Sequence, residues 1–473
     1  MDVKRRGGPD LKISKTQKVL VLGMGVTGLK ALMYVLEKGA KALAVNQGKF
    51  SEWAQFKEIQ ELQKLYPETL SISSQEDLVT DQPLDLILLS PGIARESECL
   101  KIWLARGVPV VNEIELAHRE WRDKSKGAVF AITGSNGKTT TTLMLDHLLQ
   151  KLGLKTFAGG NLGTPFCHLF LKEAGPLPEV CTLELSSFQL ESLFEFTSEA
   201  CALLNLSFTH GERYSNYESY ARAKFRMGLN LRPGALLIHP ALDDQSLEEN
   251  RWMKEWISSL ASQKIKCLEI PMTKEELLSD LQKIYELNEF ELVGSHNLQN
   301  LWVATKLLLH QYPEQSLKLK NALRGFRGAA HRLEPVPVTS GRKVFNDAKS
   351  TNWSATKIAL KAMEELAPVH LILGGQLRGL NDEIGPHLMS ITAQVKALWL
   401  YGESGAVIER ELGQTKTALS FQYFKTLEEL IREFSKQTDL APLVFSPAFP
   451  SFDQFQNYGH RGECFKAWVK DFL

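Results

Sequence analysis

The chain has 473 residues, of which 44% are apolar, so at about 150 residues per domain it can supply two to four domains with a core each. Lys plus Arg and Asp plus Glu number 55 each, and this balance argues against a nucleic-acid or anionic-membrane partner. The six cysteines include no C-x-x-C pair, which is typical of reduced thiols rather than of a disulfide or zinc framework. With no hydrophobic leader core and no run of ~18 apolar residues, we expect a soluble cytoplasmic protein.

Short apolar runs alternate with helical stretches along the whole chain, which predicts parallel sheets covered by helices and therefore an α/β fold. We divide the chain into three blocks, 1–117, 118–328 and 329–473, with the polar, charged segment 117–127 as the link between the first two. The predicted strands are 18–22, 41–45, 84–89 and 108–111 in the first block, 128–133, 155–158, 180–185, 200–206 and 235–239 in the second, and 343–346, 369–373, 397–401 and 443–446 in the third.

The first block contains Gly23-Met-Gly-Val-Thr-Gly28 between a strand and a helix, which is the dinucleotide-binding pattern in its usual context. The acidic residue that should end the next strand and bind a ribose is absent, because that strand ends in Asn46. A NAD-dependent dehydrogenase and a plain structural turn remain alternatives. We favour a different phosphate-bearing ligand, since Ser90-Pro-Gly92-Ile adds a glycine turn at the end of a neighbouring strand.

The second block opens with Gly134-Ser-Asn-Gly-Lys-Thr-Thr directly after the apolar run 128–133. A glycine turn between a strand and a helix is a phosphate cradle, in which backbone N–H groups and the helix N-terminus favour an anion. Lys138 can reach the terminal phosphates, and Thr139 lies where a hydroxyl holds Mg²⁺. Ile132 stands where a full Walker A motif has its first glycine. The loop predicts a triphosphate-like ligand and leaves open a P-loop NTPase acting as a switch or motor.

Polar residues also follow the later strands of this block. Glu184 ends an apolar strand, where a carboxylate is usually paired or bound to a metal. His210 follows the next strand, and although it reads as an ordinary loop residue by itself, this position favours a role near a cation. Lys224 lies in a helical stretch and, on sequence alone, is expected to be a solvated surface lysine.

Several motifs follow one another along the chain: the loop at Gly134, Gly159-Gly-Asn-Leu-Gly163, Glu184-Leu-Ser-Ser-Phe-Gln-Leu190, His296-Asn-x-x-Asn300, His331-Arg332, Asn346-Asp-x-Lys349-x-Thr-Asn352 and Ser446-Pro-Ala with Ser451-Phe-Asp-Gln-Phe455. This ordered set resembles the Mur ligase family, the ATP-dependent amino-acid ligases of peptidoglycan precursor synthesis, over nearly the whole chain. The resemblance implies a Rossmann-like UDP-binding domain (1–117), a central P-loop-type ATPase domain (118–328) and a Rossmann-like C-terminal domain that binds the amino acid (329–473).

Within the family, the Glu-Leu-Ser-Ser-Phe-Gln-Leu motif, the two glycine turns of the first block and the final motif resemble the members that add D-glutamate to UDP-N-acetylmuramoyl-L-alanine. The implied reaction transfers the terminal phosphoryl of ATP to the alanyl carboxylate, and the amine of D-glutamate then attacks the acyl phosphate through a tetrahedral intermediate. A ligase for another amino acid, or one of the folylpolyglutamate type, is the nearest alternative. We expect a monomer acting on small molecules.

The resemblance also implies roles for individual residues. The catalytic set is Lys138, Glu184, His210, Lys224 and Lys349. The ATP set is Gly134, Ser135, Asn136, Gly137, Lys138, Thr139, Thr140, Asn297, Asn300, Arg332 and Asp347. The substrate set is Thr27, Gly28, Asn46 and Gly92 for the UDP group, with Asn161, Thr351, Arg378, Ser451, Phe452 and Tyr458. Two Mg²⁺ ions would be held by Thr139, Glu184, His210 and Lys224, the last as a carbamate formed with CO₂.

The chain departs from the family pattern at several of these positions. Asn46 replaces the usual Asp, and Thr209 precedes His210 where Asp is common, with Glu212 close enough to substitute. Arg378 stands where a lysine is common, and an arginine can bind a carboxylate through two parallel hydrogen bonds. These changes leave the ligase chemistry intact and bear on fine specificity.

Overall fold

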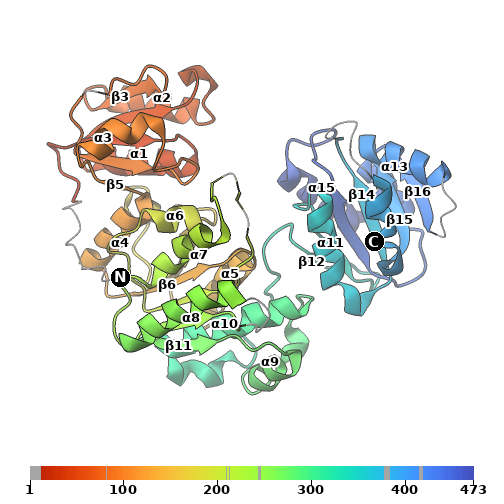
Figure 1. Cartoon of the computed structure of the whole chain (residues 1–473). Helices are drawn as coiled ribbons and strands as arrows, with labels where there is room; N and C mark the ends of the chain where they lie inside the picture. Colours follow the sequence, from red (N-terminus) through yellow and green to blue (C-terminus); the bar gives the residue numbers. More distant parts are fainter. Residues whose placement is uncertain are drawn as a thin grey trace. The chain divides into compact units, whose positions relative to one another are not determined.

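The computed structural model describes residues 12–80, 82–208, 210–211, 213–242, 247–377, 384–414 and 419–473, without the side chains of 247–249. Arg378, Thr209 and Glu212, which the sequence singles out, lie outside the described residues. The described chain forms three sheets, each built mainly from parallel strands, and Figure 1 shows them with helices packed on them. This confirms the predicted α/β class.

The first sheet has the strand order β3-β2-β1-β4-β5, and all its pairs are parallel. Its central strand Lys-Val-Leu-Val-Leu is buried at four of five positions, as expected for a strand covered on both faces. The elements are β1 (Lys18–Leu22), α1 (Val26–Glu37), β2 (Lys41–Asn46), α2 (Phe56–Leu65), β3 (Leu70–Ser74), β4 (Leu86–Leu89), α3 (Lys101–Ala105), β5 (Val110–Val111) and α4 (Glu113–Lys124).

The second sheet has the order β11-β10-β9-β6-β8-β7 and is also parallel throughout. Its central strand β6 is buried at every residue and pairs with β8 and β9, so the loops that follow these strands emerge at one edge. The elements are β6 (Ala128–Thr133), α5 (Lys138–Lys151), β7 (Thr156–Gly160), the 3₁₀ helix η3 (Phe166–Phe170), β8 (Val180–Glu184), α6 (Ser187–Glu191), β9 (Ala200–Leu203), α7 (Tyr217–Phe225), β10 (Leu236–His239), α8 (Leu247–Ser262), β11 (Lys266–Glu269), α9 (Lys274–Leu281) and α10 (Ser295–Gln311).

The third sheet has the order β12-β13-β17-β14-β15-β16, in which only the β12–β13 pair is antiparallel. Helix α14 begins with a capping box, in which Thr426 and Glu429 bond to each other's backbone N–H groups. The elements are β12 (Glu334–Val336), β13 (Val344–Asn346), α11 (Trp353–Ala362), β14 (Val369–Gly374), α12 (Ile384–Met389), β15 (Val395–Tyr401), α13 (Gly402–Gln414), β16 (Ser420–Phe424), α14 (Leu427–Phe434), β17 (Leu443–Ala448) and α15 (Tyr458–Phe472).

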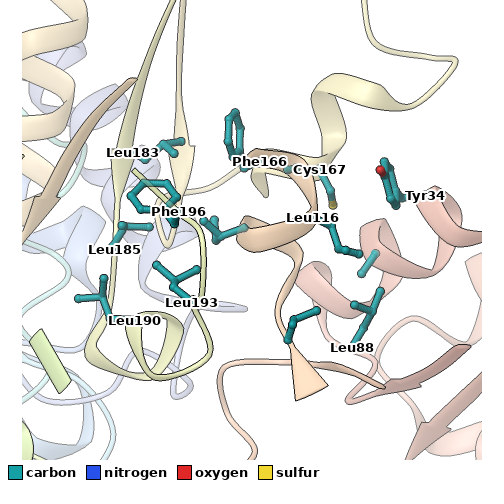
Figure 2. Packing of buried hydrophobic residues seen from close by; sticks show 14 of the residues in the cluster. Tyr34, Leu88, Leu116, Phe166, Cys167, Leu183, Leu185, Leu190, Leu193 and Phe196 are labelled. Atoms are coloured by element: carbon teal, nitrogen blue, oxygen red, sulfur yellow. The ribbon is translucent and has the colours of Figure 1, made fainter. Parts of the chain in front are cut away.

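The chain forms two compact units. The first comprises the residues up to Thr273 together with Asn300–Leu319, and the second comprises Lys274–Gln299 and Lys320–Leu473. One continuous apolar cluster runs through the first unit, and Figure 2 shows Tyr34 and Leu88 of the first sheet's layers near Cys167 and other residues of the second. The division at 117/118 and 328/329 stays a prediction.

The predicted link at 117–127 is mostly helical, because helix α4 covers residues 117–124. Its residues Ala117, His118 and Trp121 are buried, and Glu120 accepts hydrogen bonds from Tyr34 and Lys38 of α1. The many charged residues of this segment made the helix hard to recognise from the sequence. The helix is amphipathic, and its apolar side packs into the first unit. Among the described residues, no helix combines the length and apolarity needed to cross a membrane.

Candidate active site

The loop between β6 and α5 has the backbone of a phosphate cradle. Gly134 and Gly137 have φ of +151° and +83°, which glycine adopts without strain, and a Cβ on Gly137 would lie 2.7 Å from Asn300 Oδ1. Helix α5 begins at Lys138, so the first N–H groups of this helix point into the loop without intrahelical partners. The loop thus offers N–H donors and the positive end of a helix to an anion, as the sequence predicts.

The side chains around this loop hold its shape. Lys138 donates from Nζ to the carbonyl oxygens of Gly134 at 2.9 Å and Ser135 at 3.0 Å, which places its ammonium group over the loop. Thr141 Oγ1 bonds Asn300 Oδ1 at 3.1 Å in a buried contact, so α10 is tied to α5. The predicted ATP residue Asn300 therefore lies beside the cradle. In the second unit, Asn297 donates to the Val293 carbonyl at 2.7 Å.

Glu184 lies at the carboxyl end of β8, beside β6, and is 3% exposed. Its two oxygens accept hydrogen bonds from Thr139 Oγ1 and Asn161 Nδ2, both at 2.7 Å. A hydroxyl and a carboxylate are hard oxygen donors, so this pair fits Mg²⁺. Across the part of the chain that the structure describes, no three His, Cys, Asp or Glu side chains gather into a metal site by themselves. Mg²⁺ commonly completes its coordination with water and phosphate oxygens, so this donor set suits it.

Lys224 lies on α7 and is 2% exposed, which corrects the prediction of a surface lysine. Its Nζ donates to the Gly134 carbonyl at 3.0 Å and lies 3.5 Å from Thr133 Oγ1. Burial, with the charge of Lys138 adding to it, lowers the pKa of Lys224 to about 7. The amine is therefore partly neutral near neutral pH and can act as a nucleophile. The sequence missed this burial because the groups that cover Lys224 are some 90 residues distant along the chain.

His210 lies in the loop after β9 and is exposed, with a left-handed backbone at φ +63°. Its ring packs against Phe188 of α6, with 4.9 Å between ring centroids. Because α6 follows Glu184 directly, this contact brings His210 toward the same edge of the sheet. Its role as a metal ligand stays a prediction.

Two of the predicted UDP residues, Gly28 and Asn46, contact the backbone of the first glycine loop. Ser90 Oγ donates to the Gly23 carbonyl at 2.7 Å, and a Cβ on Gly28 would lie 1.7 Å from that same oxygen, so only glycine fits there. Asn46 Oδ1 accepts the N–H of Met24 at 3.3 Å, so its carboxamide supports the loop. A Cβ on Gly92 would meet open space. The ends of β1, β2 and β4 thus form one polar edge.

In the second unit, Asp347 follows β13 and is 5% exposed. It accepts hydrogen bonds from Ser446 Oγ at 2.7 Å and from the Leu333 N–H at 3.2 Å, while its burial raises its pKa to about 6. Arg332, which precedes Leu333 in the sequence, is exposed. Lys349 is also exposed, and its ammonium group lies 5.6 Å from the centre of the Tyr458 ring.

The other residues predicted to position the amino acid lie on two loops of this unit. Thr351 is half-buried after β13, Ser451 is 2% exposed, and Phe452 is 65% exposed. A buried residue that the sequence did not single out joins these loops. Arg461 of α15 is fully buried and donates to the carbonyl oxygens of Ala348 and Phe449, both at 2.9 Å. No local pattern could have found it, since Ala348 is 113 residues away.

Comparison with known proteins places these observations in a family. The family model described as "Mur ligase middle domain" matches residues 132–308, and that described as "Mur ligase MurD-like, N-terminal domain" matches residues 17–112. The UDP-N-acetylmuramoylalanine--D-glutamate ligase of Caldanaerobacter subterraneus subsp. tengcongensis is 31% identical, covering 97% of this chain and 99% of its own. The protein of the same name from Exiguobacterium sibiricum is 34% identical, covering 95% of each chain.

Solved structures agree with the fold. MurF from Acinetobacter baumannii has a TM-score of 0.54 at 17% identity, covering 91% of this chain and 90% of its own. UDP-N-acetylmuramate-alanine ligase MurC from Thermotoga maritima has a TM-score of 0.52 at 18% identity, covering 95% and 98%. The near-complete match to relatives above 30% identity, together with the two family models, shows that this chain belongs to the Mur ligase family.

Proposed function

We propose that this protein is the ATP-dependent ligase that joins D-glutamate to UDP-N-acetylmuramoyl-L-alanine through an amide bond, in cytoplasmic peptidoglycan precursor synthesis. The observation that carries this proposal is the match of nearly the whole chain to relatives that bear this activity in their names. The first unit supports it with a phosphate cradle, a Thr139–Glu184 pair and the buried amine of Lys224 around one edge of a sheet. We infer that it acts as a monomer.

The substrates divide among the predicted domains. The polar edge formed by the glycine loop at Gly23 with Asn46 would bind the UDP group, and the loop at Gly134 would bind ATP with Asn300 beside it. Asn297, Arg332 and Asp347, which belong to the second unit, are also assigned to ATP binding. Lys349, Thr351, Ser451, Phe452 and Tyr458 would receive D-glutamate, with Arg378 as the partner of its carboxylate.

The residues of the first unit suit phosphoryl transfer to a carboxylate. Lys138 is held over the loop and would turn its ammonium group from the loop carbonyls to the terminal phosphates. Asn161 fixes one oxygen of Glu184, which leaves the Thr139 side of the carboxylate to face a ligand. Mg²⁺ bound there would offset the charge that develops on the transferred phosphoryl. The amine of D-glutamate would then displace phosphate from the acyl phosphate to form the amide.

Lys224 would take part as a carbamate. Its neutral amine adds to the carbon of CO₂ and releases one proton, which leaves an anionic carbamate as an oxygen donor. Counted from the protonated lysine, two protons are released, and a buried cation is replaced by an anion. The lowered pKa of Lys224, due first to burial, supports this reaction because only the neutral amine is nucleophilic. The anionic product would also remove the repulsion between Lys224 and Lys138.

The test is release of inorganic phosphate from ATP in the presence of UDP-N-acetylmuramoyl-L-alanine and single D- or L-amino acids. We expect release with D-glutamate and the appearance of one amide product by mass spectrometry. A ligase for another amino acid would respond to that amino acid instead, and an NTPase of another class would release phosphate with no amino acid present. No response to D-glutamate would refute the proposal.

A further inference from the structure

Tyr220 is a buried aromatic residue that contacts both the glycine loop and Lys224. It lies on α7 and is 1% exposed. Its hydroxyl is 2.8 Å from Ser135 Oγ, within the Gly134-Ser-Asn-Gly-Lys-Thr loop. The ammonium group of Lys224 lies 4.8 Å from the centre of its ring. Tyr220 and Lys224 are four residues apart on one helix, a spacing at which side chains meet on the same face.

The other hydrogen bonds of Ser135 Oγ determine whether Tyr220 donates or accepts in the bond between the two hydroxyls. Ser135 Oγ accepts the N–H of Ser207 at 2.8 Å and donates its single proton to the Ser207 carbonyl, also at 2.8 Å. Since a serine hydroxyl has one proton and two acceptor positions, the bond to Tyr220 must be donated by the phenol. This arrangement uses all the hydrogen-bonding capacity of Ser135, so the loop residue is held from two sides.

The ring of Tyr220 is fixed by its own neighbours. Tyr214 and Phe208 pack edge-on against it, with centroid distances of 5.3 Å and 6.2 Å. A ring held in this way restricts the flexible side chain of Lys224, whose Nζ then keeps its bond to the Gly134 carbonyl. The attraction of a cation to the ring face adds to this restriction.

We propose that Tyr220 is a positioning residue of the ligase: its hydroxyl holds the glycine loop in the form that binds ATP, and its ring aims Lys224. The inference rests on the proposed function, because it takes ATP as the ligand of the loop and Lys224 as a catalytic group. The hydroxyl of Tyr220 acts on the loop, and the ring acts on Lys224. Removing the hydroxyl should therefore weaken ATP binding, whereas removing the ring should also impair the step that needs Lys224.

The first experiment is a double-mutant cycle on ATP affinity, measured by calorimetry with a non-hydrolysable ATP analogue and Mg²⁺ and without amino acid. Tyr220→Phe should weaken affinity about three- to tenfold, the range for one neutral hydrogen bond. Ser135→Ala should weaken it at least as much, and the double variant should match Ser135→Ala within about twofold, because the shared bond is already lost. Tyr214→Phe, a hydroxyl deletion in the same aromatic cluster, should leave affinity within about twofold. Additive effects of the two substitutions would overturn the loop role.

The second experiment separates the ring from the hydroxyl. At saturating ATP, Tyr220→Phe should keep kcat within about threefold, whereas Tyr220→Leu should lower kcat by a further tenfold or more, on the order of the loss for a displaced catalytic group. In ¹³C-bicarbonate, the carbamate resonance should persist in Tyr220→Phe and weaken in Tyr220→Leu. Equal kcat in the two variants would overturn the ring's role.

The outcomes for Tyr220 and for the proposed function are separable. A parent protein that does not respond to D-glutamate refutes the proposed function, while the nucleotide cycle still decides on Tyr220. A parent protein without a carbamate resonance refutes the carbamate, while the kcat comparison still decides on the ring. If Tyr220→Leu does not fold by circular dichroism, Tyr220→Phe and the cycle remain sufficient to refute the proposal.

Discussion

The amine of Lys224 donates to the carbonyl oxygen of Gly134 at 3.0 Å, so a helix residue contacts the first residue of the phosphate loop. The contact is buried, and its geometry links α7 to the site where ATP would bind. A lysine in this position is costly to bury as a cation. A reaction of the amine would explain why a lysine occupies this buried position, and substitution of Lys224 can test this.

Lys224→Ala should lower ligase activity about a hundredfold or more, the scale of losing one preorganised electrostatic group. Phosphate release with D-glutamate measures the effect. Acetate or formate should restore part of the activity by supplying an anionic oxygen in the vacated space. The matched control is Arg222→Ala on the same helix, where an exposed ion pair with Glu218 contributes little. Failure of every small carboxylate to restore activity would count against the carbamate.

Asn46→Ala should weaken binding of the UDP substrate about threefold to tenfold without changing ATP affinity. The reason is the loss of the Asn46 acceptor for the Met24 N–H, which supports the first glycine loop. Calorimetry with each ligand separately measures both affinities. Asn46→Asp keeps the acceptor and should retain most of the affinity; an equal loss in both variants would instead point to the amide NH₂ group.

The stability of the first unit should fall as pH rises through the range in which Glu113 ionises. Burial raises the pKa of Glu113 from 4.5 to about 7, although its hydrogen bond from the Cys167 N–H opposes this shift. Between these pH values Glu113 keeps its proton in the folded chain and has lost it in the unfolded chain. The contribution of Glu113 to the free energy of unfolding is therefore fully present below about pH 4.5 and is lost as the pH rises through about 7.

Glu113→Gln removes this ionisation and keeps a carbonyl acceptor for Cys167. The parent protein should lose stability between pH 5 and pH 8 through Glu113, and the variant should not. The difference in free energy of unfolding, variant minus parent, should therefore rise between these pH values by an amount on the order of 3 kcal/mol. Urea denaturation at the two pH values gives the difference, and Asp347, whose pKa is also raised, contributes equally to both proteins. An unchanged pH dependence would show that Glu113 is ionised throughout.

Arg461→Met should raise the KM for D-glutamate about tenfold and lower stability by a few kcal/mol. The substitution leaves the buried carbonyl oxygens of Ala348 and Phe449 without their donor, and each such group costs about 1–3 kcal/mol. Lys470→Met, an exposed position on the same helix, is the control. Denaturation midpoints and amino-acid saturation curves are the measurements. A normal KM in a destabilised variant would limit Arg461 to a structural role.

The sequence predicted all the interior strands of the three described sheets and the edge strands β5 and β7, and missed the other four edge strands. Every strand that it placed is present, and the missed strands β3, β11, β12 and β16 are all edge strands of their sheets. An interior parallel strand such as β6 is buried on both faces and reads as an apolar run. An edge strand such as β16 is half-exposed, so its sequence Ser-Phe-Gln-Tyr-Phe mixes polar and apolar residues and gives a weaker signal.

In the site, the sequence revealed the residues whose structural role depends on their neighbours in the chain, and it did not reveal those whose partners are far along the chain. The glycine loops could be recognised because the residues that shape them are neighbours in sequence, and Glu184 could be recognised because it ends a strand. Lys224, Tyr220 and Arg461 could not, since their partners lie far along the chain. For Lys224, only the family resemblance indicated a function, and the structure then showed that the side chain is buried.

Arg461 has a consequence for biosynthesis. The loops that contain Ala348 and Phe449 leave the ribosome before α15, which carries the guanidinium group that joins them. All the described strands of the third sheet are therefore translated before the residue that anchors these two loops. The amino-acid site should become competent only after translation of α15, so an incomplete chain could bind nucleotide before it could add an amino acid.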